Sequence, residues 1–278
     1  MTSFISRLAF IFLALYMVAG PAISKTSEKP KAQAVRILVV GDSLSAEYGL
    51  KRGSGWVALL ESRLAESVNW NEKKSTKKND ETKKSNPPST KNTTNNVASK
   101  AINTLSTADN TSNITPDFTV INASISGDTT SGGRSRLAPL IDLHKPTHVV
   151  IELGANDALR GLPVAKTEEN LNAMTQVALK SGAKVLLVGI QIPPNYGAEF
   201  TKQFAATYPK VAKMNNSSNK VGLVPFMLTG VADSPEFVKL FQADRIHPTE
   251  AAQAQILNNI WPELQKLLTS TATTKVKK

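Results

Sequence analysis

The sequence predicts an α/β fold, a three-layer α/β/α sandwich around a five-stranded parallel sheet. Two observations lead to this fold class. Five short runs of apolar, often β-branched residues alternate along the chain with longer amphipathic stretches, the order that produces a parallel sheet with helical crossovers. Within each run the apolar residues are consecutive rather than at every second position, as expected for strands that are buried on both faces.

The first strand is the stretch VRILVV at 35–40, which is closed by Gly41. A continuous apolar run of this length, bounded by a turn residue, indicates a fully buried strand. The other predicted strands have the same character and cover residues 118–127, 147–157, 184–190 and 221–226.

The first helix is predicted at 55–67, where Trp56, Leu59, Leu60 and Leu64 fall on one face. This spacing is typical of an amphipathic helix packed on a core. The remaining predicted helices lie between the later strands or after the last one, near 134–143, 167–181, 198–215 and 249–268.

One segment does not fit this alternation. Residues 71–113 are rich in Lys, Asn, Thr and Ser and contain no aromatic residue. Such a segment buries too little apolar surface to offset the entropy of ordering it. We therefore expect a single domain at 35–268, interrupted by a disordered insertion at 71–113 and followed by a basic tail at 269–278.

The N-terminus has the layout of a secretory signal peptide. Arg7 precedes an apolar run from Leu8 to Ala19, and small residues follow near Ala22 and Ser24. We expect a signal peptide at 1–24, a flexible leader at 25–34, and a periplasmic or secreted mature protein. An uncleaved membrane anchor is the alternative, although the run is short for a span of about 20 residues. The chain has no Cys, which excludes disulfides and thiol chemistry.

The net charge of +11 belongs to the appendages. Residues 1–34 carry +3, residues 69–115 carry +4 and the C-terminal lysines carry +3, which leaves +1 for the rest. A nucleic-acid-binding protein would gather this charge on one folded face, so we expect no nucleic-acid partner. The Lys-rich insertion leaves weak contact with an anionic membrane surface open.

Polar residues follow the predicted strands where ligands bind in open α/β sheets, outside the carboxyl ends of the strands. Ser43 follows the first strand, Gly127 the second and Asn156 the third, and a late loop holds Asp244 and His247. A serine hydroxyl becomes a nucleophile when a histidine takes its proton, and a carboxylate holds that imidazole in place. The N–H groups of Ser43 and Gly127 and the Asn156 amide are suited to stabilise an oxyanion. This set predicts acyl transfer from an ester.

The blocks GDSLS, SISGD, GAND and DRIHP stand in this order at 41–45, 124–128, 154–157 and 244–248. Together they resemble the SGNH (GDSL-type) hydrolase family. Longer strings such as INASISGDT and ELGANDALRG are similar to the branch that contains bacterial periplasmic thioesterases, lysophospholipases and arylesterases. The resemblance covers nearly all of 35–268 except the insertion.

The resemblance implies a role for each matching residue. Ser43 matches the nucleophile, and Asp244 and His247 match the other two members of the catalytic triad. Gly127 and Asn156, with the N–H of Ser43, match the oxyanion hole. Positions implied to contact substrate are Leu159, in the segment 157–164 that moves over substrate in the family, and Ile192 and Pro193 beside the acyl chain.

The implied enzyme is a serine ester hydrolase without metal or cofactor, which we expect to be a monomer. Its implied substrates are acyl-CoA thioesters, lysophospholipids and simple aryl or alkyl esters. Two departures from the branch bear on substrate fit: Ala155 stands where a second Gly is frequent, and Arg245 where a small residue is common.

Two alternatives remain open: a carbohydrate acetylesterase on the same fold, and a surface-binding module without activity. Of the residues near the blocks, we interpret Ser45 as a turn or helix-cap hydroxyl and Asp42 and Asp157 as residues that order their loops. We interpret His144 and His148 as structural.

Overall fold

The computed structural model describes residues 34–67 and 117–270. The predicted signal peptide at 1–24 and the insertion at 71–113 lie outside the described residues, as do nearly all of the leader and of the basic tail. None of the helices in the described ranges is long and apolar enough to cross a membrane.

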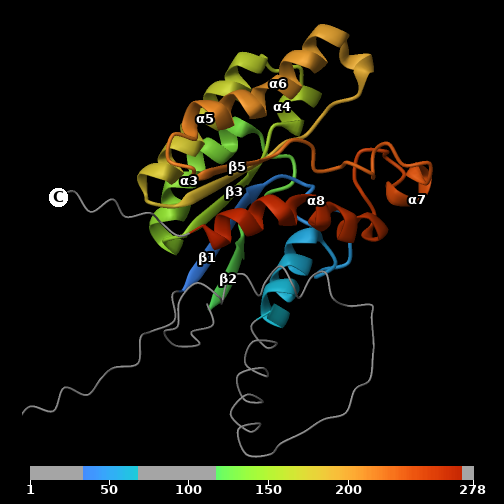
Figure 1. Ribbon diagram of the computed structural model, residues 1–278. Helices are drawn as coiled ribbons and strands as arrows, with labels where there is room; N and C mark the ends of the chain where they lie inside the picture. The colour runs from blue at the N-terminus through green and yellow to red at the C-terminus, as the bar shows by residue number, and fades with distance from the viewer. Residues whose placement is uncertain (1–33, 68–116, 271–278) are drawn as a thin grey trace, which may run out of the picture. The chain divides into compact units, whose positions relative to one another are not determined.

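A five-stranded parallel sheet forms the centre of the domain, in the order β2-β1-β3-β4-β5 (Figure 1). Its strands are β1 (Val35–Gly41), β2 (Phe118–Asn122), β3 (His148–Glu152), β4 (Lys184–Val188) and β5 (Val221–Val224). Ile37 pairs with His148 across β1 and β3, and Val185 pairs with Val221 across β4 and β5. The predicted sheet is confirmed.

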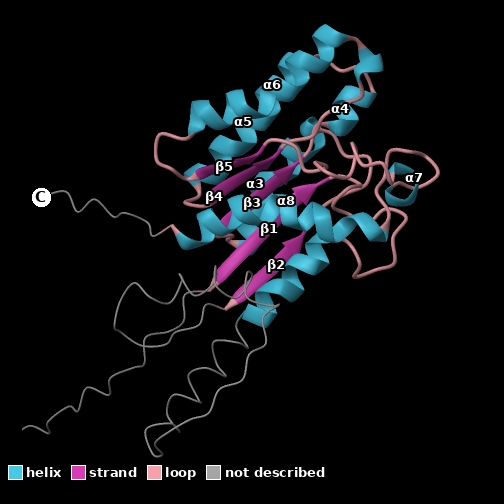
Figure 2. Ribbon diagram, turned by 45° about the vertical axis from the view of Figure 1, so that its right-hand side comes forward, coloured by secondary structure: helices cyan, strands magenta, loops and turns pink. Residues whose placement is uncertain are grey.

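Helices cover both faces of this sheet (Figure 2). On one face α3 (Thr130–His144), α5 (Val164–Lys180) and α6 (Ala198–Asn215) pack side by side. The other face carries α8 (Glu250–Thr269) and the helical residues 56–67, which contact each other through Arg63 and Trp261. The chain first moves from β1 outward to β2 and then back across the sheet, so right-handed crossovers place these two groups of helices on opposite faces.

The core lies between the sheet and these helices. Ile37 to Val40 of β1 and Val149 to Ile151 of β3 have no exposed surface, so both faces of the central strands are covered. Trp56, Leu60 and Leu64 are buried against the sheet and α8, as their spacing predicts. Leu59, predicted on the same face, is only partly buried.

The four predicted strands after the first are too long at their carboxyl ends, two of them by five residues and the other two, which end at Val188 and Val224, by two. The strand predicted at 118–127 ends at Asn122, and the one predicted at 147–157 ends at Glu152. In the second case Gly154 adopts a φ of 128°, which a residue with a side chain rarely adopts, and the short helix α4 (Ala155–Leu159) begins directly after it. A further short helix, α7 (Phe237–Leu240), was not predicted.

Candidate active site

Ser43 lies in the loop that follows β1, at the carboxyl edge of the sheet. The loop turns immediately after the strand because the Asp42 carboxylate accepts a hydrogen bond from the Leu44 N–H at 3.0 Å. The backbone N–H groups of Ser45 and Ala46 donate to the Asp42 carbonyl and continue the turn. These bonds direct the Ser43 side chain to the carboxyl edge of the sheet, here called the rim. There the side chain meets the loop that precedes α8.

Ser43, His247 and Asp244 form one continuous hydrogen-bonded chain. His247 Nε2 lies 2.8 Å from Ser43 Oγ, and His247 Nδ1 lies 2.7 Å from Asp244 Oδ2. With Nδ1 protonated and bonded to the carboxylate, Nε2 is left free to accept the Ser43 proton. The structure therefore brings together three residues that the sequence places in two distant blocks, GDSLS and DRIHP.

The loop that holds Asp244 and His247 is shaped by the Asp244 side chain itself. Asp244 Oδ1 accepts hydrogen bonds from the backbone N–H groups of Ile246 and His247 at 2.9 and 3.0 Å. Arg245, which lies between Asp244 and Ile246, has a φ of 58°, which is uncommon for a residue with a side chain. This conformation explains why a small residue would suit position 245.

The Asp244 carboxylate is held in its charged form. Partial burial raises its pKa, but the hydrogen bonds from the His247 backbone and side chain and from Ile246 outweigh that effect and lower the pKa to about 2. Asp244 thus remains an anion next to His247 at any pH at which the protein is ordinarily studied.

Tyr48 is a neighbour of the His247 ring that sequence reasoning missed. The centres of the two rings lie 4.3 Å apart with a 40° tilt. Tyr48 belongs to the Ser43 loop, and the Gln242 side chain donates to its carbonyl at 2.9 Å. The loops that carry Ser43 and His247 are therefore tied together by ring packing and by a hydrogen bond.

The predicted oxyanion donors also converge at this edge of the sheet. In the described part of the chain neither the Ser43 N–H nor the Gly127 N–H donates a hydrogen bond to another group. Gly127 has a φ of 81°, which a glycine adopts without strain. Asn156 Nδ2 donates to Asp42 Oδ2 at 3.2 Å and to the Asp128 carbonyl at 3.0 Å.

The three predicted substrate contacts differ in exposure. Leu159, at the end of α4, is 36 % exposed, and Pro193 is exposed as well. Ile192 is buried in the core, with 6 % of its surface accessible. The structure thus leaves Leu159 and Pro193 accessible to a ligand, whereas the burial of Ile192 does not fit the predicted contact with an acyl chain.

Comparisons with known proteins agree with this site. The profile of the GDSL-like lipase/acylhydrolase family matches residues 99–255. Esterase TesA of Pseudomonas aeruginosa is 41 % identical over 238 residues, which are 86 % of this chain and 92 % of that protein. The chain belongs to the GDSL-like lipase/acylhydrolase family. The resemblance to SGNH hydrolases is confirmed, and the chain is an ester hydrolase.

Other relatives of this acylhydrolase carry related names. The arylesterase of Vibrio mimicus is 35 % identical over 89 % of this chain and 93 % of its own length. The thioesterase 1/protease 1/lysophospholipase L1 of Escherichia coli K12 is 32 % identical over 85 % of this chain and 86 % of its own.

Solved structures of the family share the fold. The crystal structure of TesA superposes with a TM-score of 0.62 at 40 % identity, over 84 % of this chain and 99 % of that one. The psychrotrophic esterase EstA of Pseudoalteromonas, in a structure inhibited by monoethylphosphonate, gives a TM-score of 0.59 at 31 % identity, over 84 % and 99 %.

Next to the candidate triad of this acylhydrolase lies a buried pair of acids, of which sequence reasoning missed one. Glu152 ends β3 and is 1 % exposed, and Asp42 is fully buried. Ser45, interpreted from the sequence as a turn or cap hydroxyl, is also buried and donates to Glu152 Oε2 at 2.7 Å, which corrects that interpretation. Asp157, interpreted from the sequence as ordering its own loop, instead lies in α4 and accepts from the Thr130 N–H at the start of α3 at 2.8 Å.

The two other histidines lie away from Ser43. His144 ends α3, and the hydrogen bonds of the His247 ring go to Ser43 and Asp244 instead. His148 begins β3, at the opposite edge of the sheet, where its Nε2 lies 3.3 Å from the Leu267 carbonyl. Burial lowers the pKa of His148 to about 4, with a further contribution from the charge of Lys184. Within the described ranges no cluster of three or more His, Asp or Glu is placed to hold a metal ion.

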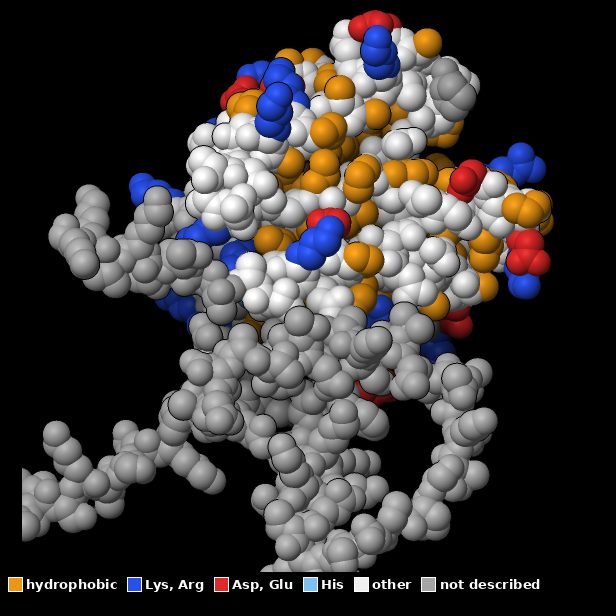
Figure 3. All heavy atoms as spheres, in the orientation of Figure 1, with side chains coloured by type: hydrophobic (Ala, Val, Ile, Leu, Met, Phe, Trp, Pro, Cys, Tyr) orange, Lys and Arg blue, Asp and Glu red, His pale blue; other side chains and the backbone are white. Residues whose placement is uncertain are grey.

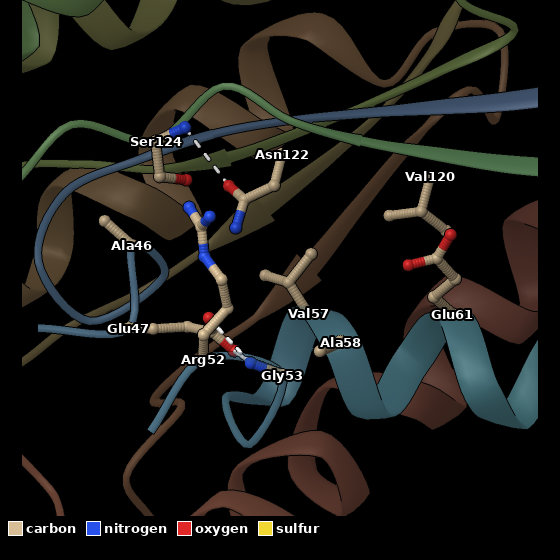
Figure 4. Close-up of a pocket in the computed structure, with 10 residues that line it drawn as sticks. All are labelled: Ala46, Glu47, Arg52, Gly53, Val57, Ala58, Glu61, Val120, Asn122 and Ser124. Atoms are coloured by element: carbon tan, nitrogen blue, oxygen red, sulfur yellow. Dashed lines mark hydrogen bonds between the residues drawn. The ribbon is translucent and has the colours of Figure 1, made fainter. Parts of the chain in front are cut away.

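A hollow of about 350 Å³ adjoins the acylhydrolase site without including it. Ala46 and Arg52 of the segment after Ser43 line one side, and Asn122 and Ser124 line the other (Figure 4). The Arg52 side chain extends toward Asn122 and Ser124 in this view. Since none of Ser43, Asp244 and His247 lines the hollow, these candidate catalytic residues lie outside it.

Exposed apolar side chains are drawn mainly from the loops of the carboxyl edge. Those with at least a third of their surface accessible there are Tyr48, Ile125, Leu159, Leu162, Tyr196 and Ile246. Figure 3 shows apolar side chains gathered on one face in the region between α6 and α7. The rim therefore offers apolar surface next to the candidate catalytic residues.

Proposed function

We propose that the protein hydrolyses esters and thioesters through an acyl-Ser43 intermediate. The observation that carries this proposal is the hydrogen-bonded chain from Ser43 through His247 to Asp244, with distances of 2.8 and 2.7 Å. No other serine of the described chain has an imidazole nitrogen at its hydroxyl together with a carboxylate on the other ring nitrogen. This arrangement is what makes a serine hydroxyl nucleophilic near neutral pH.

In the first half of the reaction Ser43 Oγ forms a bond to the carbonyl carbon, and its proton passes to His247 Nε2. The negative charge that develops on the carbonyl oxygen is stabilised by the N–H groups of Ser43 and Gly127 and by the Asn156 amide. His247 then gives its proton to the departing alcohol or thiol as the bond to the carbonyl carbon breaks. In the second half water replaces the leaving group, and the same proton transfers release the acid and free Ser43.

The free backbone donors support this assignment of the oxyanion hole. The N–H groups of Ser43 and Gly127 have no partner in the described part of the chain, so an incoming oxyanion displaces no protein bond from them. Asn156 donates to Asp42 and Asp128 in this structure. Its amide must share or exchange one of those bonds when it contacts the oxyanion.

The proposed substrates carry an acyl chain: acyl-CoA thioesters, lysophospholipids, and aryl or alkyl esters. The relatives named as thioesterase, lysophospholipase and arylesterase support this range, and so do the exposed apolar residues of the rim, including Leu159. We further propose export to the periplasm or medium, supported by the N-terminal sequence from Arg7 to Ser24. The mature protein is proposed to act as a monomer without a cofactor.

The substrate assignment is tested by an activity profile of the purified mature chain on acyl-CoA, lysophospholipid and acetylated sugars. A parallel series of nitrophenyl esters from acetyl to long acyl chains measures the preferred chain length. We expect turnover on acyl substrates longer than acetyl. Activity confined to acetyl esters would support the carbohydrate acetylesterase alternative, and absence of turnover on all of them would support a binding module.

A further inference from the structure

A carboxylic acid that takes no part in the proposed reaction is buried beneath the nucleophile loop. Glu152 is 1 % exposed, and in the described chain no Lys, Arg or His lies within ion-pair distance of it. An ionised carboxylate in such a place would carry a large desolvation penalty with no cation to offset it. Its surroundings therefore favour the neutral acid.

Glu152 contacts the residues on both sides of Ser43. Its Oε2 accepts a hydrogen bond from Ser45 Oγ at 2.7 Å and a longer one from the Asp42 N–H at 3.4 Å. Ser45 Oγ in turn accepts from Trp56 Nε1 at 3.2 Å, which fixes the hydroxyl against the helix at 56–67. The nucleophile loop is thus anchored at positions 42 and 45, one and two residues from Ser43.

The same contacts lead to the proposed oxyanion donor. Asp42, whose backbone N–H reaches Glu152, accepts the Asn156 amide at Oδ2 and the Leu44 N–H at Oδ1. A displacement of Asp42 therefore moves both the turn that carries Ser43 and the acceptor that orients Asn156. The catalytic groups of two strand ends share a single buried support.

Gly41 provides a second, independent sign of how closely this support is packed. A Cβ atom at Gly41 would lie 2.8 Å from Glu152 Oε2 and 2.8 Å from both Cβ and Oγ of Ser45. No carbon atom fits at that distance without moving the side chains. Position 41 is a glycine because the Glu152–Ser45 bond occupies the space of a side chain.

We propose that Glu152 is a positioning residue that acts as a neutral hydrogen-bonding acid, holding Asp42 and Ser45 so that Ser43 and the Asn156 amide meet the reacting carbonyl together. This inference rests on the roles proposed above for Ser43 and Asn156. In this proposal Glu152 contributes to turnover through the residues that it holds in place and not through contact with substrate.

The electrostatics agree with this assignment. Burial, followed by the charge of Asp42, raises the pKa of Glu152 well above its ordinary value. Burial also raises the pKa of Asp42 to about 7, with smaller contributions from Asp128 and Asp157 and opposing hydrogen bonds from Leu44 and Asn156. Two carboxyl groups that disfavour each other's charge keep at least one proton between them at neutral pH.

Two variants of Glu152 separate positioning from space filling. Glu152→Gln keeps the shape and an acceptor for Ser45 and Asp42, whereas Glu152→Met keeps most of the volume but removes the acceptor. We expect Glu152→Gln to retain turnover within a few-fold on a soluble nitrophenyl ester. We expect Glu152→Met to lower kcat by about 10²-fold with little change in KM, since a misplacement of about 1 Å costs that much. Glu169→Gln, at an exposed position, is the matched control.

A double-mutant cycle with Asn156→Ala tests whether Glu152 affects kcat through Asn156. The effects of mutating two residues that act through one another are not additive. We expect the kcat loss of Glu152→Met to shrink in the Asn156→Ala background. Infrared spectra at neutral pH should show a protonated carboxyl band that Glu152→Gln removes. Should Glu152→Met not fold, Ser45→Ala removes the same bond and should lower kcat in the same direction.

Three results overturn the inference. An inactive but folded Glu152→Gln would mean that the negative charge is needed. A folded Glu152→Met with the kcat of the parent would reduce Glu152 to a packing residue, even if its melting temperature fell. A fully additive cycle would separate Glu152 from Asn156. Ser43→Ala, measured in parallel, keeps these outcomes distinct: if that variant remained active, the proposed function itself would be wrong.

Discussion

His247 Nε2 lies 2.8 Å from Ser43 Oγ, although the two residues are 204 positions apart in the sequence. They meet because Ser43 follows β1, an interior strand of the sheet, while His247 precedes α8, which returns across the face that also holds residues 56–67. Gln242 reinforces the approach by donating to the Tyr48 carbonyl at 2.9 Å. The contact depends on the topology of the whole domain rather than on local sequence.

Ser43→Ala should abolish turnover while the protein stays folded. Loss of a triad nucleophile typically lowers kcat by about 10⁶-fold, because the acyl intermediate has no oxygen to form on. The measurement is nitrophenyl ester hydrolysis, together with mass-spectrometric mapping of a fluorophosphonate label. The label should appear at Ser43. Labelling at Ser45 would contradict the assignment, as would turnover close to that of the parent.

Asn156→Ala should lower kcat more than it raises KM. Its amide is proposed to contact charge that exists only in the transition state, and removal of one such donor costs about 10²–10³-fold. Steady-state kinetics on the same soluble ester separate the two constants. A change in KM alone would make Asn156 a substrate-binding residue.

Asp244→Asn should lower kcat by about 10⁴-fold, since the amide no longer fixes the imidazole with Nδ1 protonated. Because the pKa of Asp244 is about 2 in the folded protein, below the usual 3.8, its carboxylate stays charged as the pH falls toward 4. Its contribution to stability is complete above pH 3.8 and is lost as the pH falls through 2. Loss of activity between pH 7 and pH 5 should therefore occur without a change in the charge of Asp244. An infrared titration in which the Asp244 carboxylate became protonated above pH 4 would refute this expectation about its charge.

The edge of the sheet where these residues gather could be predicted from the sequence because alternation of strands and helices indicates that the strands are parallel. The apolar runs ending in Gly41, Asn122 and Glu152 place their following residues at one edge whatever the details of packing. Family blocks then identified Ser43 and His247. The same reasoning overextended the second strand, since nothing local marks Asn122 as its end. There the side chain turns to donate to the Ser45 carbonyl at 2.8 Å and accept from the Ser124 N–H at 3.1 Å.

The residues that sequence reasoning missed act through contacts between distant segments. Tyr48 packs on His247 only because two loops from opposite ends of the chain meet. Glu152 did leave a signal, a single acid inside the apolar run VVIEL at 149–153, which a strand buried on both faces should not tolerate without a partner. Its partners, Ser45 and Asp42, belong to a strand end more than 100 positions away. Periodicity carries no information on such pairs.

His148 should make the protein less stable in mild acid. Its pKa is about 4 when folded and about 6.5 in the unfolded chain, so between these values the unfolded state binds a proton that the folded state does not. The unfolding free energy has its full value above pH 6.5 and should fall by up to about 3 kcal/mol as the pH drops to 4. Urea denaturation at pH 4.5 and pH 7 measures this difference. His148→Gln should reduce it, whereas His144→Gln should not. An unchanged difference in His148→Gln would assign the acid sensitivity to other groups.

Replacing residues 71–113 with a short turn should preserve turnover on a soluble ester. The described chain reaches this segment from the helix at 56–67 and leaves it at Phe118, the first residue of β2. Phe118 pairs with Val35 at the amino edge of the sheet, and the Val35 N–H donates to the Asp117 carbonyl at 2.7 Å.

Ser43 and Asn156 follow the carboxyl ends of β1 and β3, at the opposite edge from this junction. Closure entropy of a loop changes by only about 0.6 kcal/mol per doubling of its length, so the shortened chain should also fold. We expect kcat and KM on a nitrophenyl ester to stay within a few-fold of the parent, and the melting temperature to stay equal or rise slightly. The matched control shortens the rim instead, by removing Leu162 and Pro163, and should lower activity. A large loss of kcat in the folded 71–113 deletion would mean that the segment reaches the catalytic edge from the far side of the sheet.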